Sequence, residues 1–433
     1  MKTTRIIMCL LLSINIFSTM ASVTTINAEQ LSPFYDVSRI KNSVSVEICS
    51  LFRKILWEEF GYEKYPNDFA GAYINDENSL VLVFTHGNSD KYKFYITKEM
   101  IRQIIYYGKY MYSLSESTKN YIEKNIVSFV EKTFSYNYLI ELQRGLNNVF
   151  LELDLIKTAL NERTNTVDIY LKNWNSKDNV CEYLKKMNYS TDAVAFYKSD
   201  SDVLQQMSPG NRIVFDKTGA RGTIGFNAIY NDEYGIVTNS HLALIDETIK
   251  FNNIVVGQPS FSIIDEITYN KSVDVAFIPF PDQASYAASQ MIDNDVIITS
   301  TGRPVSTSII SDIALRSELI LGADNYKYGV STERTIGKIT STCVSIYVGY
   351  GSGGRVMCDV ISYSNNGDQG DSGGPFGMFS NDTLGRYYIR LMGINFAGVN
   401  NGEGNSYGIK LSNIMEIEGL YPITNNTLFC KYR

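Results

Sequence analysis

The sequence predicts an all-β domain in its second half, preceded by a smaller domain of mixed α+β class. At 433 residues the chain is longer than one ordinary hydrophobic core usually supports. Its 44% of hydrophobic and 20% of charged residues are typical of a globular protein rather than a disordered one. After about residue 210 the sequence consists of short apolar runs separated by glycine-rich turns, whereas helix-like spacing is common before residue 205. We therefore expect a boundary within residues 205–210.

The region from 29 to 205 combines two kinds of apolar pattern. Segments 97–130 and 136–162 repeat apolar residues at the spacing of one helix face, which predicts helices there. Two short runs rich in Val, Ile and Leu, at 80–84 and 166–171, are typical of strands. The mixture predicts an α+β domain.

The first 28 residues have the features of a secretory signal peptide. Lys2 and Arg5 precede an apolar run of about a dozen residues, and small residues follow, with Ala21 or Ala28 as the cleavage position. The run is too short for a permanent membrane-spanning helix. We expect an exported, extracellular protein with no membrane span.

Charge and motif content exclude several classes of function. A formal net charge of −7 and an isoelectric point near 5.2 argue against a nucleic-acid partner. The sequence contains no Cys-x-x-Cys pair, no His-Glu-x-x-His motif and no phosphate-binding glycine loop. We therefore expect no metal and no cofactor.

Six cysteines are present, of which Cys9 would leave with the signal peptide. Cys343 and Cys358 flank a predicted hairpin whose loop is the glycine-rich segment 349–354, so the two could face each other across it. We expect a disulfide between them; the alternative is a pair of small buried thiols. The sequence does not indicate what happens to the other cysteines, Cys49, Cys181 and Cys430.

Residues 370–375 read Gly-Asp-Ser-Gly-Gly-Pro, a composition suited to a nucleophilic serine. A serine hydroxyl becomes reactive when a base takes its proton, and the intermediate that it forms needs donors where the oxyanion develops. Glycines allow the backbone to turn so that the N–H groups of Gly370 and Ser372 point into one hole. The alternative is an ordinary Gly/Ser/Asp turn.

The base that such a serine needs can be only one of two residues, because the chain has two histidines. His86 lies in a polar turn and is expected to be a surface residue. His241 follows an apolar Val-Thr stretch and two small residues. We expect His241 to be the base.

The third member of such a site is a carboxylate that orients the histidine. Asp274 lies inside an apolar run, where an aspartate is costly to bury unless it is paired. Holding an imidazole in the right tautomer would justify that position. Asp265 and Asp282 are the alternatives, but both lie beside polar or turn-like residues and are better explained as solvated loop carboxylates.

On these motifs, residues 207–433 resemble the chymotrypsin-like serine proteases, and in particular the secreted bacterial streptogrisin and α-lytic branch. Segment 370–375 matches the nucleophile loop of that family residue for residue, and the order His241, Asp274, Ser372 is the chymotrypsin order. The resemblance implies two antiparallel six-stranded β-barrels with the active site between them. It also implies that residues 29–206 are an α+β propeptide; the alternative is an independent accessory domain.

The resemblance also assigns residues around the nucleophile. Segment 325–332 aligns without gaps with a segment of that bacterial branch and puts Lys327 where the family has an arginine. It implies a buried ion pair between Lys327 and Asp371, with lysine a weaker, single-point partner than a guanidinium. Asn366, six residues before Ser372, is the expected specificity position. The expected substrate-binding wall is formed by Phe396, Ala397 and Gly398.

The sequence therefore predicts a secreted, monomeric serine endopeptidase that acts on proteins or peptides. It would be made as a zymogen, with its own propeptide as a partner and cleavage near Gln206-Met207. The alternative is a secreted binding or adhesion protein that keeps the protease fold with a degenerate site. The intact set of His241, Asp274 and Ser372 disfavours that alternative.

Overall fold

The computed structural model describes most of the chain after residue 36. The described residues are 37–107, 115–198, 204–205, 212–217, 219, 221–251, 254–268, 270–280, 295–297, 307–350, 353–368, 370–381, 387–398 and 406–423. The expected signal peptide, the Gln206-Met207 junction, Asp282 and Cys430 lie outside them. The chain divides into two compact units, Met1–Asn137 and Tyr138–Arg433.

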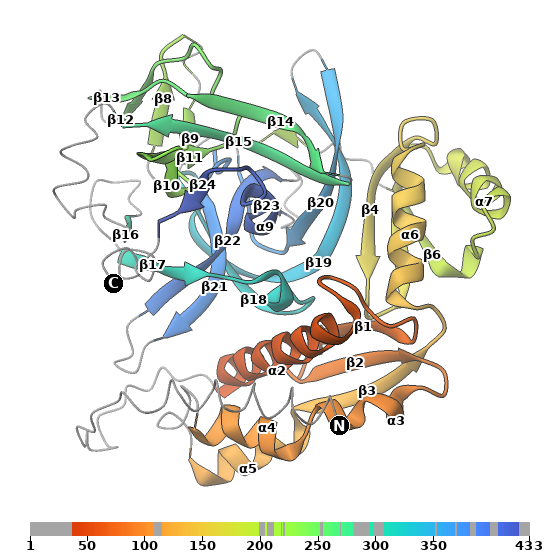
Figure 1. The fold of residues 1–433 in the computed structure, drawn as a ribbon. Coiled ribbons are helices and arrows are strands. Elements are labelled where there is room, and N and C mark those ends of the chain that lie inside the picture. The colour runs from red at the N-terminus through yellow and green to blue at the C-terminus, as the bar shows by residue number, and fades with distance from the viewer. Residues whose placement is uncertain are drawn as a thin grey trace. The chain divides into compact units, whose positions relative to one another are not determined.

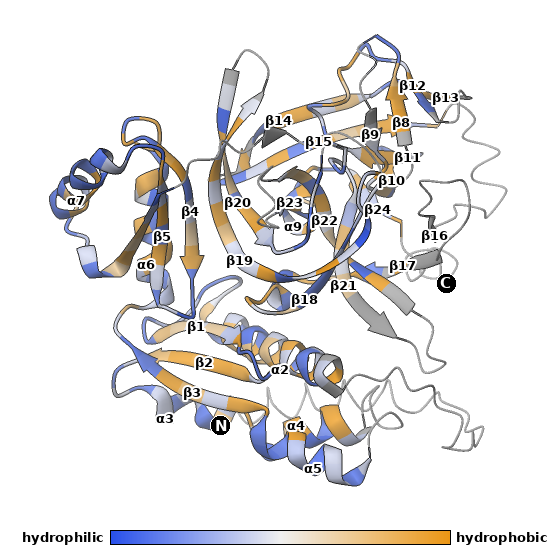
Figure 2. Ribbon diagram, turned by 180° about the vertical axis from the view of Figure 1, so that it is seen from behind, coloured by the Kyte–Doolittle hydropathy of each residue, from blue (hydrophilic) through white to orange (hydrophobic). Residues whose placement is uncertain are grey.

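The first unit packs one long helix against a three-stranded sheet (Figures 1 and 2). The sheet has the order β1 (Phe69–Ile74), β2 (Leu80–Thr85) and β3 (Val127–Lys132), with β1 antiparallel and β3 parallel to β2. Helix α2 (Val37–Phe60) buries apolar side chains at a spacing of four residues, which keeps them on one face. They are Val44, Ile48, Phe52 and Leu56.

Short helices complete this unit. The helical region predicted over 97–130 extends too far toward the C-terminus. Helices α3 (Ser89–Tyr92), α4 (Lys98–Arg102) and α5 (Glu116–Asn125) are present, as is a π turn at Gln103–Tyr107. The side chains of Thr97 and Ser115 cap α4 and α5 by accepting hydrogen bonds from backbone N–H groups, at 3.1 and 3.2 Å. The prediction of helix through residue 130 was wrong because Val127–Lys132 pairs with β2 as a strand.

The second unit begins with a small α/β layer that joins a larger sheet. Helix α6 (Tyr136–Asn147) precedes strands β4 (Leu155–Asn161) and β5 (Thr166–Leu171), and helix α7 (Lys177–Lys186) precedes β6 (Val194–Lys198). Strand β4 pairs antiparallel with β19 (Glu333–Tyr350), so β4, β5 and β6 extend one continuous sheet (Figure 1). The structural division therefore lies near residue 137, not at the boundary expected within 205–210. Strand β4 was also missed, because its residues lie in a segment that predicts helix.

Among the described residues from 212 to 423 the regular structure is almost entirely β, as predicted. The strands of the first half are β8 (Arg212–Phe215), β9 (Arg221–Thr223), β10 (Phe226–Tyr230), β11 (Glu233–Thr238), β12 (Ile249–Phe251), β13 (Ile254–Gly257), β14 (Phe261–Thr268) and β15 (Lys271–Pro279). Those of the second half are β16 (Asp295–Ile297), β17 (Thr307–Ile313), β18 (Asp324–Gly329), β19, β20 (Gly353–Tyr363), β21 (Pro375–Asn381), β22 (Tyr387–Gly398), β23 (Ser406–Lys410) and β24 (Leu420–Pro422), with helix α9 (Leu411–Ile414) after β23.

These strands form three sheets. The first half divides into a five-stranded sheet, β14-β15-β11-β10-β24, and a four-stranded sheet, β13-β12-β8-β9. Strands β16–β23 form one sheet together with β4–β6 and the short strand β7 (Leu204–Gln205), which makes the sheet of the second half 12-stranded. The pairing thus supports a β domain in two halves, with β24 returning to the first half, but the two six-stranded barrels stay a prediction.

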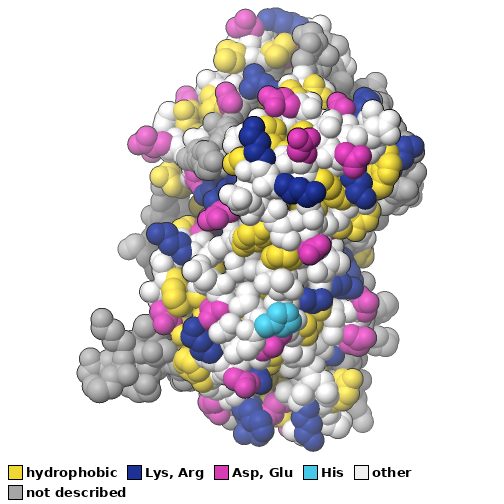
Figure 3. Space-filling model, turned by 90° about the vertical axis from the view of Figure 1, so that its right-hand side faces the viewer, with side chains coloured by type: hydrophobic (Ala, Val, Ile, Leu, Met, Phe, Trp, Pro, Cys, Tyr) yellow, Lys and Arg dark blue, Asp and Glu magenta, His cyan; other side chains and the backbone are white. Residues whose placement is uncertain are grey.

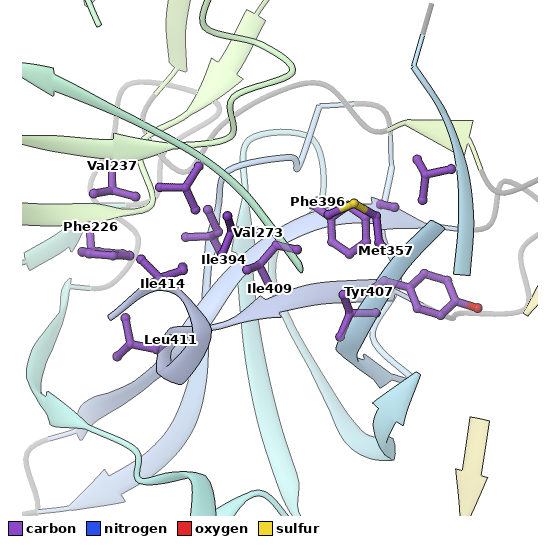
Figure 4. Close-up of a cluster of buried hydrophobic side chains, with 14 of the residues drawn as sticks. Phe226, Val237, Val273, Met357, Ile394, Phe396, Tyr407, Ile409, Leu411 and Ile414 are labelled. Carbon is purple, nitrogen blue, oxygen red and sulfur yellow. The ribbon is translucent and has the colours of Figure 1, made fainter. Parts of the chain in front are cut away.

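A single hydrophobic cluster connects the two halves (Figure 4). Phe226, Val237 and Val273 come from the first half, and Ile394 and Phe396 come from β22 in the second. All five are at most 2% exposed. Because this core holds β11 and β15 against β22, it also fixes the loops at the ends of those strands.

The predicted hairpin is present, but the predicted disulfide was wrong. Cys343 and Cys358 do not form a disulfide. Strand β19 pairs with β20 at Val344↔Val360 and at Ile346↔Met357, with register shifts between, so the two cysteines are not opposite each other. The Cys343 thiol instead donates to Gln143 Oε1 at 3.3 Å, and burial raises its pKa to about 11.

Candidate active site

His241, three residues after the end of β11, forms a buried pair with Asp274, which lies within the adjacent strand β15. Nδ1 of His241 lies 2.5 Å from Oδ2 of Asp274, and the backbone N–H of His241 donates to Oδ1 at 3.0 Å. The side chains are 2% and 0% exposed. Asn239 Nδ2 donates to the Asp274 carbonyl at 2.9 Å. Both carboxylate oxygens thus hold the histidine in one orientation.

The alternation of strand β15 explains how an aspartate reaches this position. Successive side chains of a strand point to opposite faces. Val273, Val275 and Phe277 enter the hydrophobic cluster between the two halves, so Asp274 lies on the other face, toward His241. The carboxylate is fully buried, and its hydrogen bonds to His241 compensate for the loss of water.

The loop that carries Ser372 packs against the strand that leads to His241. Gly373 has a φ of +89°, a left-handed conformation that favours glycine. A Cβ at Gly373 would lie 2.4 Å from the Thr223 carbonyl oxygen and 2.5 Å from Thr238 Oγ1. The N–H of Thr223 donates to the Ser372 carbonyl at 3.1 Å. Since Thr238 is three residues before His241, the serine loop and the histidine segment meet here.

Ser372 itself is buried, and its Oγ donates to the backbone carbonyl of Phe396 at 3.3 Å. The N–H groups of Asp371, Gly373 and Gly374 form backbone hydrogen bonds. Among the described residues, no backbone hydrogen bond uses the N–H of Gly370 or Ser372. Two donors of this loop are therefore available to an anionic group beside Ser372.

Asp371 and Lys327 form an ion pair in which both side chains are fully buried. The Asp371 carboxylate also accepts from Thr332 Oγ1 at 2.6 Å and from the N–H groups of Ser331, Thr332 and Asp368 at 3.1, 3.3 and 3.2 Å. Lys327 Nζ donates to Thr332 Oγ1 at 2.8 Å as well. Burial lowers the pKa of Lys327, and the Asp371 carboxylate opposes that shift. The carboxylate before the nucleophile is thus held by an internal cation and a nest of donors.

The expected specificity residues lie on two segments. Asn366 is exposed, and its carbonyl accepts from Thr335 Oγ1 at 3.4 Å. Phe396, Ala397 and Gly398 form the end of β22, and the Phe396 side chain points into the hydrophobic core rather than toward solvent (Figure 4).

The end of β22 is paired with another part of the same chain. Strand β7 (Leu204–Gln205) runs antiparallel to it, with Ala397 opposite Gln205 and Gly398 opposite Leu204. A short segment just before residue 206 therefore occupies the edge that we expected to bind substrate.

The other described candidates, His86 and Asp265, are exposed to solvent. The His86 side chain is 70% exposed and 3.9 Å from Glu131, and Asp265 is 70% exposed beside Arg355, so each is solvated. No group of histidine, cysteine or acidic side chains among the described residues could hold a metal ion. In the same part of the chain no helix has the length and apolarity to cross a membrane. On the face that Figure 3 shows, basic and acidic side chains are interspersed.

Sequence reasoning missed Tyr363 and Asn395. Both are fully buried, and their side chains link to each other and to the serine loop. The signal that could have found Asn395 is the one that found Asp274: a polar residue inside the apolar run Ile394-Asn395-Phe396.

The structure is similar to solved bacterial serine proteases over about half of the chain. For Thermobifida fusca protease A the TM-score is 0.36 at 16% identity, covering 51% of this chain and 99% of that one. For Nocardiopsis protease the TM-score is 0.35 at 17% sequence identity, and the match covers 52% of this chain and 100% of that one. For Cellulomonas bogoriensis chymotrypsin the TM-score is 0.34 at 16% sequence identity, and the match covers 51% of this chain and 99% of that one. No protein-family model and no curated protein matches the chain. Because these TM-scores are low, the function proposed below rests on the geometry of the site.

Proposed function

We propose that the protein is a serine endopeptidase with Ser372 as nucleophile, His241 as general base and Asp274 as the residue that orients and stabilises the imidazolium. The observation that carries this proposal is the buried His241–Asp274 pair beside the loop of Ser372. The available N–H groups of Gly370 and Ser372 support an oxyanion hole.

In this mechanism, His241 takes the hydroxyl proton as Ser372 Oγ attacks the peptide carbonyl carbon. The imidazolium then donates that proton to the leaving amine, and an acyl-enzyme remains. Water, deprotonated by His241, attacks the ester and releases Ser372. Asp274 stays ionised throughout, because its task is to stabilise the positive charge on His241.

The hydrogen bond from Ser372 to the Phe396 carbonyl suggests how substrate prepares the nucleophile. An extended peptide lying antiparallel to β22 would offer a backbone N–H to the Phe396 carbonyl. That N–H would replace the Ser372 hydroxyl as the donor, which leaves Oγ able to turn toward His241. Substrate binding and nucleophile release would then be one event.

We further propose that the chain is made as a secreted zymogen whose own strand blocks the site. The pairing of Leu204 and Gln205 with the end of β22 supports this, because a substrate would use the same edge. A residue that continued this register would face Phe396, whose carbonyl is 3.3 Å from Ser372 Oγ. We therefore keep Gln206-Met207 as the proposed cleavage site, and we expect cleavage by the enzyme itself.

A fluorophosphonate probe tests the proposed activity, because it labels only an activated serine. The protein, cut after residue 206, should be labelled at Ser372 and should hydrolyse an unfolded protein substrate. Ser364→Ala, at an exposed serine before the loop, is the matched control and should be labelled like wild type. Cut, folded protein that takes up no probe would instead favour a binding protein with a degenerate site.

A further inference from the structure

A polar chain inside the second half connects a buried tyrosine to the nucleophile loop. The Tyr363 hydroxyl donates to Asn395 Oδ1 at 2.7 Å, and Asn395 Nδ2 donates to the Asp371 carbonyl at 3.1 Å. Tyr363 and Asn395 are both fully buried. The Tyr363 ring also stacks on Phe376, with ring centroids 4.9 Å apart. Its hydroxyl is therefore fixed by packing as well as by hydrogen bonding.

The backbone of Asn395 binds the same loop on the other side of Ser372. Its carbonyl accepts from the N–H of Gly373 at 2.7 Å, and its N–H donates to the Gly374 carbonyl at 2.8 Å. Together with its side chain, Asn395 makes three hydrogen bonds that enclose Ser372. Such a set restricts rotation of the peptide groups between Asp371 and Gly374.

The peptide group between Asp371 and Ser372 is the one that matters chemically. A peptide group is planar and trans, so its carbonyl and its N–H point in opposite directions. The Asp371 carbonyl accepts from Asn395 Nδ2 and from the Gly374 N–H, both at 3.1 Å. Fixing that carbonyl also fixes the direction of the Ser372 N–H. Hydrogen bonds to the carbonyl polarise the same peptide group further.

We propose that Tyr363 and Asn395 are positioning residues that aim the Ser372 N–H at the developing oxyanion. The inference rests on the proposed function, since it assigns a task within that reaction. Neither side chain touches the substrate. They act through the Asp371 carbonyl, so they stabilise the transition state and leave ground-state binding of the peptide unchanged.

Two substitutions test this role at different strengths. Tyr363→Phe removes only the hydroxyl and should lower kcat roughly tenfold with KM nearly unchanged. Asn395→Leu removes the donor to the Asp371 carbonyl and should lower kcat by about 10²–10³-fold, the range for loss of an oxyanion-hole donor. Tyr407→Phe is the matched control, because Tyr407 is another buried tyrosine of this sheet whose hydroxyl accepts from Lys157 instead. It should retain kcat.

Inhibitor binding separates positioning from a general structural effect. A peptide aldehyde forms a tetrahedral adduct with an oxyanion, whereas the corresponding product peptide does not. Aldehyde affinity should fall in parallel with kcat/KM in Tyr363→Phe, while product affinity stays the same.

Equal losses of affinity for both ligands, or full kcat in folded Tyr363→Phe, would overturn the inference and leave the protease activity unaffected. If Asn395→Leu does not fold, Tyr363→Phe still decides. Cut wild-type protein that cleaves nothing would reject the proposed function, and this inference with it.

Discussion

Two buried carboxylates in the second half of the β domain use similar chemistry in different surroundings. Asp371 is held by Lys327 and by donors of the 331–332 segment, one residue before Ser372. Asp359, on β20, accepts a hydrogen bond from Lys410. Its two carboxylate oxygens also accept from Nη2 of Arg316, at 3.0 and 2.9 Å.

The difference between them lies in what their neighbours do. The carbonyl of Asp371 belongs to the peptide group that carries the Ser372 N–H, so the position of Asp371 affects the direction of that N–H. Asp359 instead ties strands β20 and β23 to helix α9, where Asn413 also accepts from Arg316 at 3.2 Å. A buried, paired carboxylate is therefore not by itself a sign of catalysis. The Asp371 pair should control turnover and the Asp359 cluster should control stability alone.

The largest effect is expected at the nucleophile that Asp371 precedes. Ser372→Ala should lower peptidase activity by on the order of a million-fold, because the members of such a triad act as a unit. His241→Ala should cause a similar loss. Both variants should fold and accumulate uncut at the size left after signal removal. Activity is measured on a protein substrate and processing by gel. Retention of more than a few per cent of activity in Ser372→Ala would show that another residue is the nucleophile.

The next effect separates the two carboxylates directly. Lys327→Met leaves Asp371 buried without its cation, which should lower the free energy of unfolding by about 3–5 kcal/mol and also reduce kcat. Lys410→Met should destabilise the protein by a similar or smaller amount, because Arg316 still contacts Asp359, yet kcat of the folded fraction should be unchanged. Urea unfolding and steady-state kinetics measure the two quantities. Equal loss of kcat from both substitutions would mean that the Asp359 cluster also affects the reaction.

The sequence could predict candidate site residues wherever the signal is local. The Gly-Asp-Ser-Gly-Gly-Pro run, the presence of only two histidines and an aspartate in an apolar strand each need only a short stretch of sequence. The burial of Asp274 follows from its place inside an apolar run, and the mainly β character of the described residues after 212 follows from short apolar runs separated by glycine-rich turns.

What could not be predicted depends on pairing between distant segments. Helix-like spacing continues to residue 130, but residues 127–132 form β3, because β2 is available to pair with them. Register shifts within β19 separate Cys343 from Cys358, and symmetry about the loop gives no sign of them. The division near residue 137 arises because β4 pairs with β19, almost two hundred residues later. Strand pairing of this kind is a tertiary contact, which the local propensity of a segment does not predict.

Acid should affect the Asp359 cluster in a defined range of pH. Burial opposes ionisation of Asp359, but Arg316 and Lys410 lower its pKa to about 2, below the usual value near 3.9 in an unfolded chain. The folded state therefore binds this proton less readily than the unfolded state does. The resulting stability, about 2–3 kcal/mol at most, is present above pH 4 and lost as the pH falls from about 4 to 2.

Asp359→Asn isolates that contribution. The variant should be less stable than wild type above pH 4, and the difference in unfolding free energy should shrink as the pH falls toward 2. Urea unfolding at a series of pH values measures it. A difference that stays constant over this range would mean that Asp359 titrates normally. The same substitution should leave kcat at neutral pH unchanged, as expected for a carboxylate remote from the nucleophile.

The smallest effect is expected at the new N-terminus. In proteases activated by a freed N-terminal ammonium, that group pairs with the carboxylate before the nucleophile, so its position is critical. Here Lys327 and the donors around it already satisfy Asp371 from within the same unit. A cleavage site for an external protease, introduced at residue 206 or a few residues to either side, should therefore yield enzymes whose kcat/KM values agree within about twofold. Acetylating the new amine should also have no effect. A tenfold loss in either experiment would mean that Asp371 needs a cation that Lys327 does not supply, and the internal pair would then be a structural link like that of Asp359.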